Sequence, residues 1–420
     1  MTISSRKAAL AAVLLASVAF PAAAEPVFNR IASFPVAQNL PDDKDKLSVS
    51  SAEIITATDD GNTLIYSDSP LGAIGFIDIT DAKAPKAGGA VMMDGEPTSV
   101  TSSAGKALVA VNTSESKAKP SGRLAIVDVA TRKIESTCDL GGQPDSIALN
   151  KDKTLGAIAI ENERDEEVND GKIPQMPAGD LVVFQVKNGA VDCGTIKHVA
   201  LTGLAGVAPE DPEPEFVAFN GLNEIALTLQ ENNEIVIIDA NTAAVKTHFS
   251  AGSVDLTGID TKRDGALKFS GESKGVLREP DAVKWLDDNR LLVANEGDYQ
   301  GGSRGFTIFD KTGKLLYESG ASSNALSPIS ATIRKAGRDR RASSPKVSKP
   351  PSSATSNISS CSPNAPRSSA STRTPAPIPN SSSCCRPAFR RKARSPFLRA
   401  ICLRPPTNST SARTAVRAHM

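Results

Sequence analysis

The chain has 420 residues, enough for one large domain or two ordinary ones, and its formal net charge is only +1. This near-neutral balance hides two unlike segments, because residues 325–420 carry 18 of the 48 Lys and Arg residues but one of the 47 acidic residues. Residues 1–324 therefore hold 30 basic and 46 acidic residues, and such an acidic segment argues against nucleic-acid binding, which needs a basic surface.

The first 24 residues have the pattern of a secretory signal peptide. Arg6 and Lys7 precede an apolar run over residues 8–20, and Ala22 to Ala24 offer a small-residue cleavage site. We expect the mature chain to start near Glu25 and to be periplasmic or secreted. The apolar run is too short for a transmembrane helix, and no later stretch is long enough, so no transmembrane segment is expected.

Residues 25–321 contain a repeated motif in which a Glu or Gln precedes a proline and a strand. Self-similarity at a spacing of this kind indicates a repeat architecture. The four copies begin at Glu96, Gln143, Glu213 and Glu279.

Each copy predicts four short strands separated by polar turns. In the last module we expect strands at 282–286, 290–296, 305–310 and 314–318. The third strands of the earlier modules are expected at 73–79, 123–129, 180–186 and 234–240. Four-stranded modules in series predict an all-β β-propeller, with five blades that begin near Ala52, Glu96, Gln143, Glu213 and Glu279.

The third strands end in aspartates that precede turns. We expect Asp78, Asp128, Asp239 and Asp310 to shape these turns on the outside of the blades rather than to bind a ligand. Residues 27–36 are expected to form a strand on which a complete ring would close.

Two cysteines occupy similar places in consecutive modules. Cys138 and Cys193 both lie near the last strand of a module, and an oxidising compartment would let them form a disulfide. The alternative is a pair of separate thiols packed as small apolar groups.

Residues 322–420 form a basic segment that is rich in Ser, Pro, Arg and Ala and has no periodicity. One interpretation is a disordered low-complexity tail. The other is translation in the wrong frame: residues 344–349 can be encoded so that a frame two bases later reads Pro-Glu-Gly-Val-Glu. The same offset gives repeat-like phrases within 387–393 and 399–408. This second interpretation adds two modules to the five visible ones and predicts seven blades in the unshifted protein.

Over residues 27–320 the chain resembles the choice-of-anchor I family of secreted propellers, which is related to YVTN-type repeats. The resemblance rests on the stretches 160–165, 169–171, 174–179, 278–283 and 294–299. It implies a secreted β-propeller. Members of the family are often labelled alkaline phosphatase or phytase-like esterase, so the resemblance also implies a possible phosphoester hydrolase. The chain departs from the family pattern after about Ala321.

Propeller topology places the start of each first strand and the end of each second strand on the same rim. Carboxylates and amides gathered there would suit Ca²⁺ or Mg²⁺, which prefer oxygen ligands. The alternative is that these side chains only cap turns. The predicted metal ligands are Glu161, Glu163, Asp165, Glu279, Asp281, Asn295, Glu296 and Asp298.

No residue pattern identifies a catalytic group. The three histidines, His198, His248 and His419, have no metal-ligand spacing, and the chain has no Gly-x-Ser-x-Gly motif or P-loop. We therefore expect a non-enzymatic binding protein that takes a cation, a glycan or a protein on its acidic rim. The alternative is a metal-dependent phosphoester hydrolase that binds a small anion through the metal.

Overall fold

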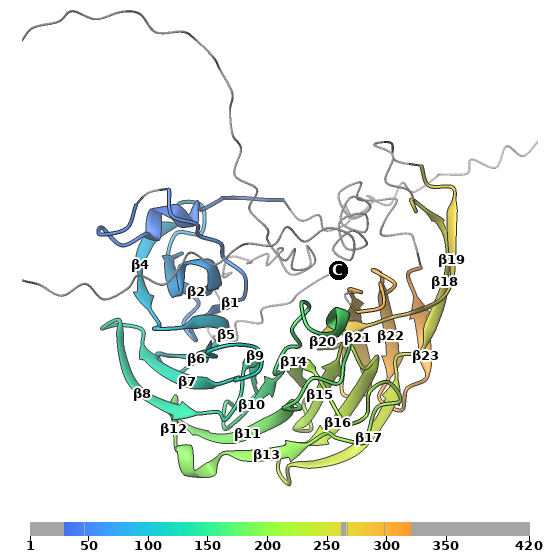
Figure 1. The fold of residues 1–420 in the computed structure, drawn as a ribbon. Coiled ribbons are helices and arrows are strands. Elements are labelled where there is room, and N and C mark those ends of the chain that lie inside the picture. Colours follow the sequence, from blue (N-terminus) through green and yellow to red (C-terminus); the bar gives the residue numbers. More distant parts are fainter. Residues whose placement is uncertain (1–28, 46, 262–265, 267, 298, 321–420) are drawn as a thin grey trace, which may run out of the picture.

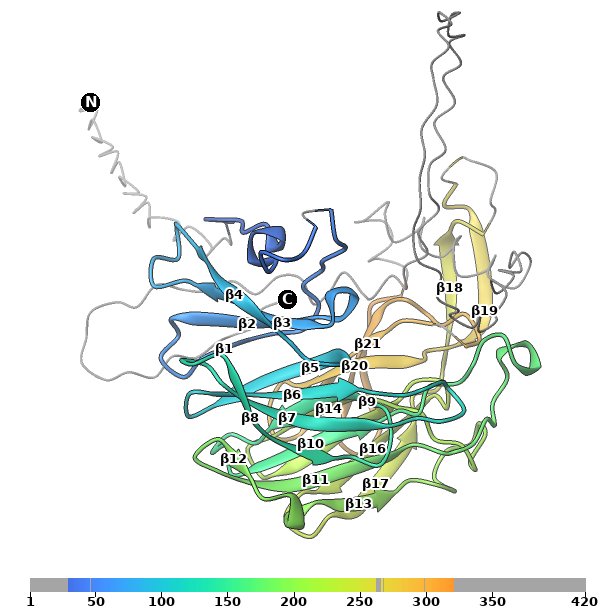
Figure 2. The same cartoon turned by 60° about the vertical axis from the view of Figure 1, so that its left-hand side comes forward.

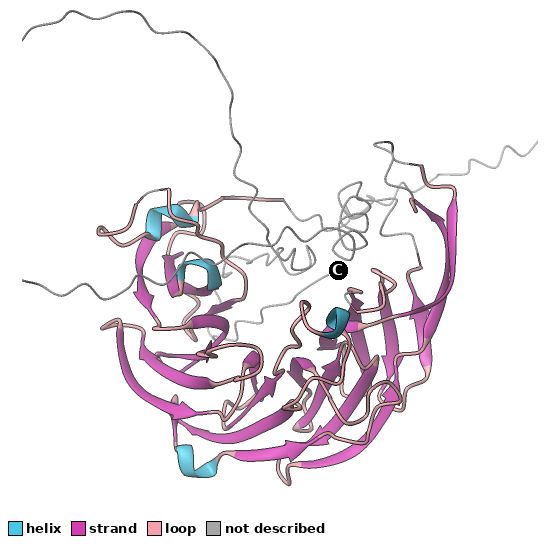
Figure 3. Cartoon of the chain, viewed as in Figure 1, coloured by secondary structure: helices cyan, strands magenta, loops and turns pink. Residues whose placement is uncertain are grey.

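The computed structural model describes residues 29–320 except 46, 262–265, 267 and 298. The described part is all-β, with only four short 3-10 helices (Figure 3). It forms six antiparallel sheets: four with four strands, one with five and one with two. The predicted signal peptide, the residues after 320 and Asp298 lie outside the described residues.

Each of the five predicted modules folds into one sheet of consecutive strands. The first two sheets are β1 (Ile55–Ala57), β2 (Thr63–Asp68), β3 (Ala73–Asp78) and β4 (Lys86–Met92), then β5 (Glu96–Ser103), β6 (Lys106–Asn112), β7 (Gly122–Asp128) and β8 (Lys133–Asp139). The third sheet holds β9 (Pro144–Leu149), β10 (Leu155–Ile160), β11 (Asp180–Lys187), β12 (Ala190–Val191) and β13 (Lys197–Ala200). The fourth and fifth are β14 (Pro214–Phe219), β15 (Glu224–Leu229), β16 (Glu234–Asp239) and β17 (Ala244–Ser250), then β20 (Pro280–Trp285), β21 (Arg290–Asn295), β22 (Phe306–Asp310) and β23 (Leu315–Glu318).

The sheets follow one another around an arc in chain order (Figure 1). The first strand of each sheet lies toward the inside of the arc and the last strand toward the outside. The first strands of neighbouring sheets pack together, β5 on β9, β9 on β14 and β14 on β20. This radial order of four-stranded sheets is the arrangement that the repeats predicted; the expected total of seven blades stays a prediction.

Apolar layers between successive sheets form the core. The layer between the third and fourth sheets, for example, contains Leu181, Leu227 and Val236, all fully buried. Strands β15 and β16 are buried on both faces, because neighbouring residues point alternately toward the third and the fifth sheet. Burial on both faces explains why these strands are almost continuously apolar.

A two-stranded hairpin interrupts the series. Strands β18 (Ser253–Ile259) and β19 (Gly271–Leu277) lie between the fourth and fifth sheets in the chain and project away from them (Figure 2). Every second residue is polar over part of each strand, at positions 253, 255 and 257 in β18 and 272 and 274 in β19.

The predicted strand over residues 27–36 is wrong for the part that the structure describes. Residues 29–35 have no strand, and η1 (Val36–Asn39) follows them as a short helix. Its last residue, Asn39, is buried and donates to the Tyr66 hydroxyl at 3.0 Å and the Phe76 carbonyl at 2.7 Å. Phe34 and Val36 pack against Tyr66, so this segment covers the outer face of the first sheet instead of adding a strand to it.

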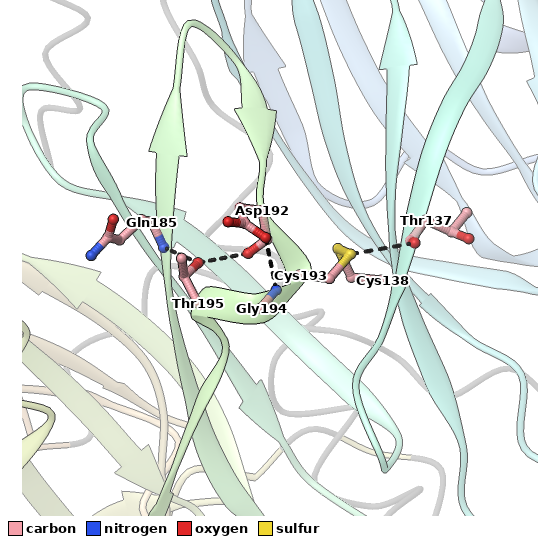
Figure 4. The surroundings of a disulfide bond; sticks show 7 residues. All are labelled: Thr137, Cys138, Gln185, Asp192, Cys193, Gly194 and Thr195. Carbon is pink, nitrogen blue, oxygen red and sulfur yellow. Dashed lines mark hydrogen bonds between the residues drawn. A yellow bond between two sulfur atoms is a disulfide. The ribbon is translucent and has the colours of Figure 1, made fainter.

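Of the two alternatives for the cysteines, the structure has the disulfide. Cys138 in β8 is bonded to Cys193 in η4 (Cys193–Thr195), with their Cα atoms 5.4 Å apart (Figure 4). The Asp192 side chain accepts the Gly194 N–H at 2.9 Å and so holds the turn that presents Cys193. The bond fastens the outer edge of the second sheet to that of the third.

Candidate functional site

The predicted rim exists at the start of the first strands and the end of the second strands. The register pairs Pro144 with Ile160, Pro214 with Leu229 and Pro280 with Asn295. The start of each repeat motif therefore lies beside the loop that leaves the second strand. η2 (Ser69–Leu71) and η3 (Asn169–Gly171) belong to loops of this kind.

The amide side chains on this rim hold the backbone. Asn162 accepts the N–H of Gln143 at 2.9 Å, and Asn232 accepts that of Glu213 at 2.9 Å. The N–H of Glu279 donates to Asn233 at 3.0 Å, from the preceding sheet. Each asparagine thus fixes the first residue of a repeat motif, which explains the spacing of these residues without a ligand.

Several predicted metal ligands also have structural partners. The fully buried Glu279 carboxylate accepts the N–H groups of Tyr299 at 3.1 Å and Gln300 at 2.5 Å. Glu163 forms an ion pair with Lys117, which lies in the loop between β6 and β7. These carboxylates therefore close loops on the rim.

Three further predicted ligands, Asp165, Asn295 and Glu296, take part in separate contacts. Asp165 accepts the N–H of Glu167 at 2.9 Å, as in an ordinary turn, and the Asn295 amide donates to Thr307 at 2.9 Å. The backbone N–H of Glu296 donates to Glu279. In the ranges that the structure describes, no group of three or more His, Cys, Asp and Glu side chains is arranged to hold a metal ion.

A buried arginine organises the long loop between β10 and β11, which sequence reasoning did not predict. Arg164 is 5% exposed and pairs with Glu231 and, at 3.5 Å, with Glu213. Its Nε donates to the Gly171 carbonyl at 3.0 Å, and its guanidinium lies 5.2 Å from the centre of the Tyr299 ring. The sequence signal was an arginine in an acidic loop whose one other basic residue is Lys172.

One arginine cannot compensate both of its carboxylates. Burial, followed by the charge of Glu231, raises the pKa of Glu213 to about 10, although Arg164 opposes the shift. Glu213 is therefore protonated at neutral pH and Glu231 is left as the ionic partner of Arg164.

Further carboxylates gather toward the inside of the arc. Asp145, Glu215 and Asp281 each follow the proline of a repeat motif on β9, β14 and β20, whose strands pack side by side. Burial first, and then the charges of Asp145, Glu161, Asp281 and Glu231, raise the pKa of Glu215 well above its ordinary value. We call these five residues the inner carboxylate group. Sequence reasoning included Glu161 and Asp281 but missed Asp145, Glu215 and Glu231; the acidic residue after three of the four prolines could have revealed the first two.

A family model for the choice-of-anchor I domain matches residues 54–301, more than half of the chain. The chain belongs to the choice-of-anchor I family. This membership suggests a secreted, β-propeller-like protein, in agreement with the sequence prediction. No helix among the described residues of this choice-of-anchor I protein is long and apolar enough to cross a membrane.

The choice-of-anchor I chain is also similar to a solved structure of hydrazine synthase from Kuenenia stuttgartiensis, with 14% sequence identity and a TM-score of 0.42. The match covers 62% of this chain and 71% of the other. The comparison with curated proteins found no match.

The outer edge of the choice-of-anchor I domain confirms the prediction for the aspartates that end the third strands. Asp128, Asp239 and Asp310 accept backbone N–H groups of the turns that follow them, and Asp78 does the same for Thr80. His198 on β13 and His248 on β17 lie on outer strands of their sheets, where they pair with Asp180 at 2.7 Å and Glu234 at 2.8 Å. Neither belongs to the inner carboxylate group.

Proposed function

We propose that this choice-of-anchor I domain is a non-enzymatic binding domain whose inner carboxylate group recognises a positively charged ligand. The observation that carries the proposal is the convergence of five carboxylates from three neighbouring sheets, where burial and then repulsion by the other four raise the pKa of Glu215. A bound cation would remove this repulsion, so binding and ionisation of Glu215 favour each other.

The surrounding structure supports a fixed site. Asp145, Glu215 and Asp281 stand on strands, not on loops, and the rim asparagines hold the starts of β9 and β14. The Arg164 guanidinium pairs with Glu231, one of the five members of the group. The described carboxylates are not arranged to hold a metal ion, so a Lys or Arg side chain of a protein partner is the cation that this proposal favours.

The test is calorimetric titration of the intact chain with a short peptide rich in Lys and Arg, with Ca²⁺ and Mg²⁺ titrated in parallel. Glu215→Gln removes one charge from the group, and Glu115→Gln removes one from a carboxylate that is 76% exposed and lies in the loop between β6 and β7. We expect Glu215→Gln to weaken binding at least about tenfold, or 1.4 kcal/mol, and Glu115→Gln to leave it unchanged. Equal affinity in both variants would refute the inner carboxylate group as the site.

Proton release is a second readout. Because the cation and the proton compete for Glu215, binding should release protons over the pH range in which Glu215 is still protonated, and Glu215→Gln should abolish this release. The alternative function, a metal-dependent phosphoester hydrolase, predicts release of phosphate from a simple phosphate ester that a chelator stops. Binding without turnover supports the binding domain.

A further inference from the structure

The fifth sheet has strands that are apolar on both faces but are buried on only one. In β21, Leu291 and Val293 are buried, whereas Leu292 and Ala294 between them are half-buried. In β22 the same alternation leaves Phe306 and Ile308 half-buried. An exposed face is normally polar, so this pattern is typical of strands that are covered on both sides.

One face of the sheet packs on the fourth sheet through Val283, Leu291, Val293 and Phe309. The other face presents Leu292, Ala294, Phe306, Ile308 and Tyr317, and we call it the open face. Tyr317 is paired with Ile308 across β22 and β23, is 48% exposed, and stacks on Phe306 with ring centres 5.4 Å apart. Two aromatic rings and a branched chain thus meet solvent on one surface.

The corresponding faces elsewhere in the described residues are covered. In the fourth sheet, Ala226, Ile235 and Ile237 face the fifth sheet and are at most 1% exposed. At the other end of the arc, Phe34 and Val36 cover the first sheet. The open face therefore continues a type of interface that already joins each sheet to the next.

We propose that the open face is the docking surface for a further four-stranded sheet of this same repeat, encoded by the stretch after codon 320 in the reading frame two bases later. The chain leaves the fifth sheet after β23, its outermost strand, and the first three sheets are followed in the same way directly by the next repeat. Codons that encode residues 344–349 in the first frame can read Pro-Glu-Gly-Val-Glu in the second frame, which matches the start of a repeat. This proposal does not depend on the cation site.

The first test is the nucleotide sequence of the gene. The second frame must stay open from codon 320 to beyond codon 387 and must encode the alternating strands of a repeat. A stop codon in this interval, or the absence of strand patterns, would overturn the proposal whatever the protein does in solution.

The second test compares the 420-residue chain with a restored chain, in which one base inserted within codons 321–330 changes the reading frame. Ile308→Asp places a charge on the open face, and Ile134→Asp is the matched control on β8, at a side chain that is 37% exposed. In the restored chain, Ile308→Asp should lower the unfolding temperature far more than Ile134→Asp. In the 420-residue chain the two substitutions should lower the unfolding temperature by similar amounts.

Hydrogen exchange gives an independent measure. Amides of β22 and β23 should exchange at least about tenfold more slowly in the restored chain, because a covering sheet suppresses local opening. Equal exchange in the two chains would refute the proposal. It would also be refuted if these amides of the 420-residue chain were protected by dimer formation and Ile308→Asp removed that protection. The latter result would assign the open face to a second copy of the chain.

Discussion

Removal of the Cys138–Cys193 disulfide should cost about 4 kcal/mol of unfolding free energy. The bond closes a loop across a sequence separation of 55 residues. The chain-entropy relation for cross-links gives roughly 3 kcal/mol for 15 residues and 4.7 for 100, so a separation of this size lies at about 4. The cost arises because the reduced, unfolded chain regains conformations that the bond forbids.

The perturbation is the double substitution Cys138→Ala and Cys193→Ala, measured by thermal and urea unfolding. The remaining four of the six cysteines should be replaced by Ser in both proteins, so that no other pairing interferes. A loss of this size corresponds to a fall in unfolding temperature on the order of 10 °C. Thiol titration must first confirm that the parent is oxidised. If the unfolding free energies of the oxidised parent and the double variant differ by less than about 1 kcal/mol, the entropic argument is refuted.

Three other substitutions test the rim. Arg164→Ala should cost about 3–5 kcal/mol in urea unfolding, because it leaves buried carboxylates without their cation, whereas the exposed control Arg290→Ala should cost less than about 1 kcal/mol. Asn232→Ala removes the acceptor of one N–H and the donor to three carbonyls, at 2.9–3.3 Å, and should cost about 3 kcal/mol; the exposed Asn241→Ala should be near neutral in the same assay. Burial and a neighbouring carboxylate raise the pKa of Glu213 from 4.5 to about 10, so the folded state holds a proton that the unfolded chain releases, and stability should fall as pH rises between these values. Glu213→Gln, which imitates the protonated form, should reduce this slope in unfolding measured from pH 5 to 9; an unchanged slope would contradict the assignment.

Local patterns predicted most of the fold. The last module was expected at 282–286, 290–296, 305–310 and 314–318, and the structure has strands at Pro280–Trp285, Arg290–Asn295, Phe306–Asp310 and Leu315–Glu318. Short apolar runs between polar turns determine such boundaries to within a few residues. The repeat also placed Cys138 and Cys193 near the last strands of consecutive modules, which made a disulfide one of two alternatives, and the structure has it.

The wrong and missing predictions concern contacts between distant residues. Residues 29–36 resemble a strand in sequence, but a strand also needs an open partner edge, and Asn39 instead ties the segment to Tyr66 and Phe76. A carboxylate cannot be recognised as a loop anchor from its own sequence neighbours. Glu279 looked like a metal ligand until the structure placed the N–H groups of residues 299 and 300 against it. The pairing of Arg164 with Glu231 crosses 67 residues, beyond the reach of any local motif.

The two ends of the series of sheets differ, because the first sheet is covered and the fifth sheet has an open face. Because residues 34–39 close one end and each sheet is built from one continuous stretch of chain, stability accumulates from neighbour to neighbour, as in a one-dimensional array. Fraying should then start at β20–β23 and spread backward, while β1–β4 stay protected on both sides. Since the amino-terminal sheets leave the ribosome or the translocation channel first, the protected end of the array is also the end that can fold before synthesis is complete.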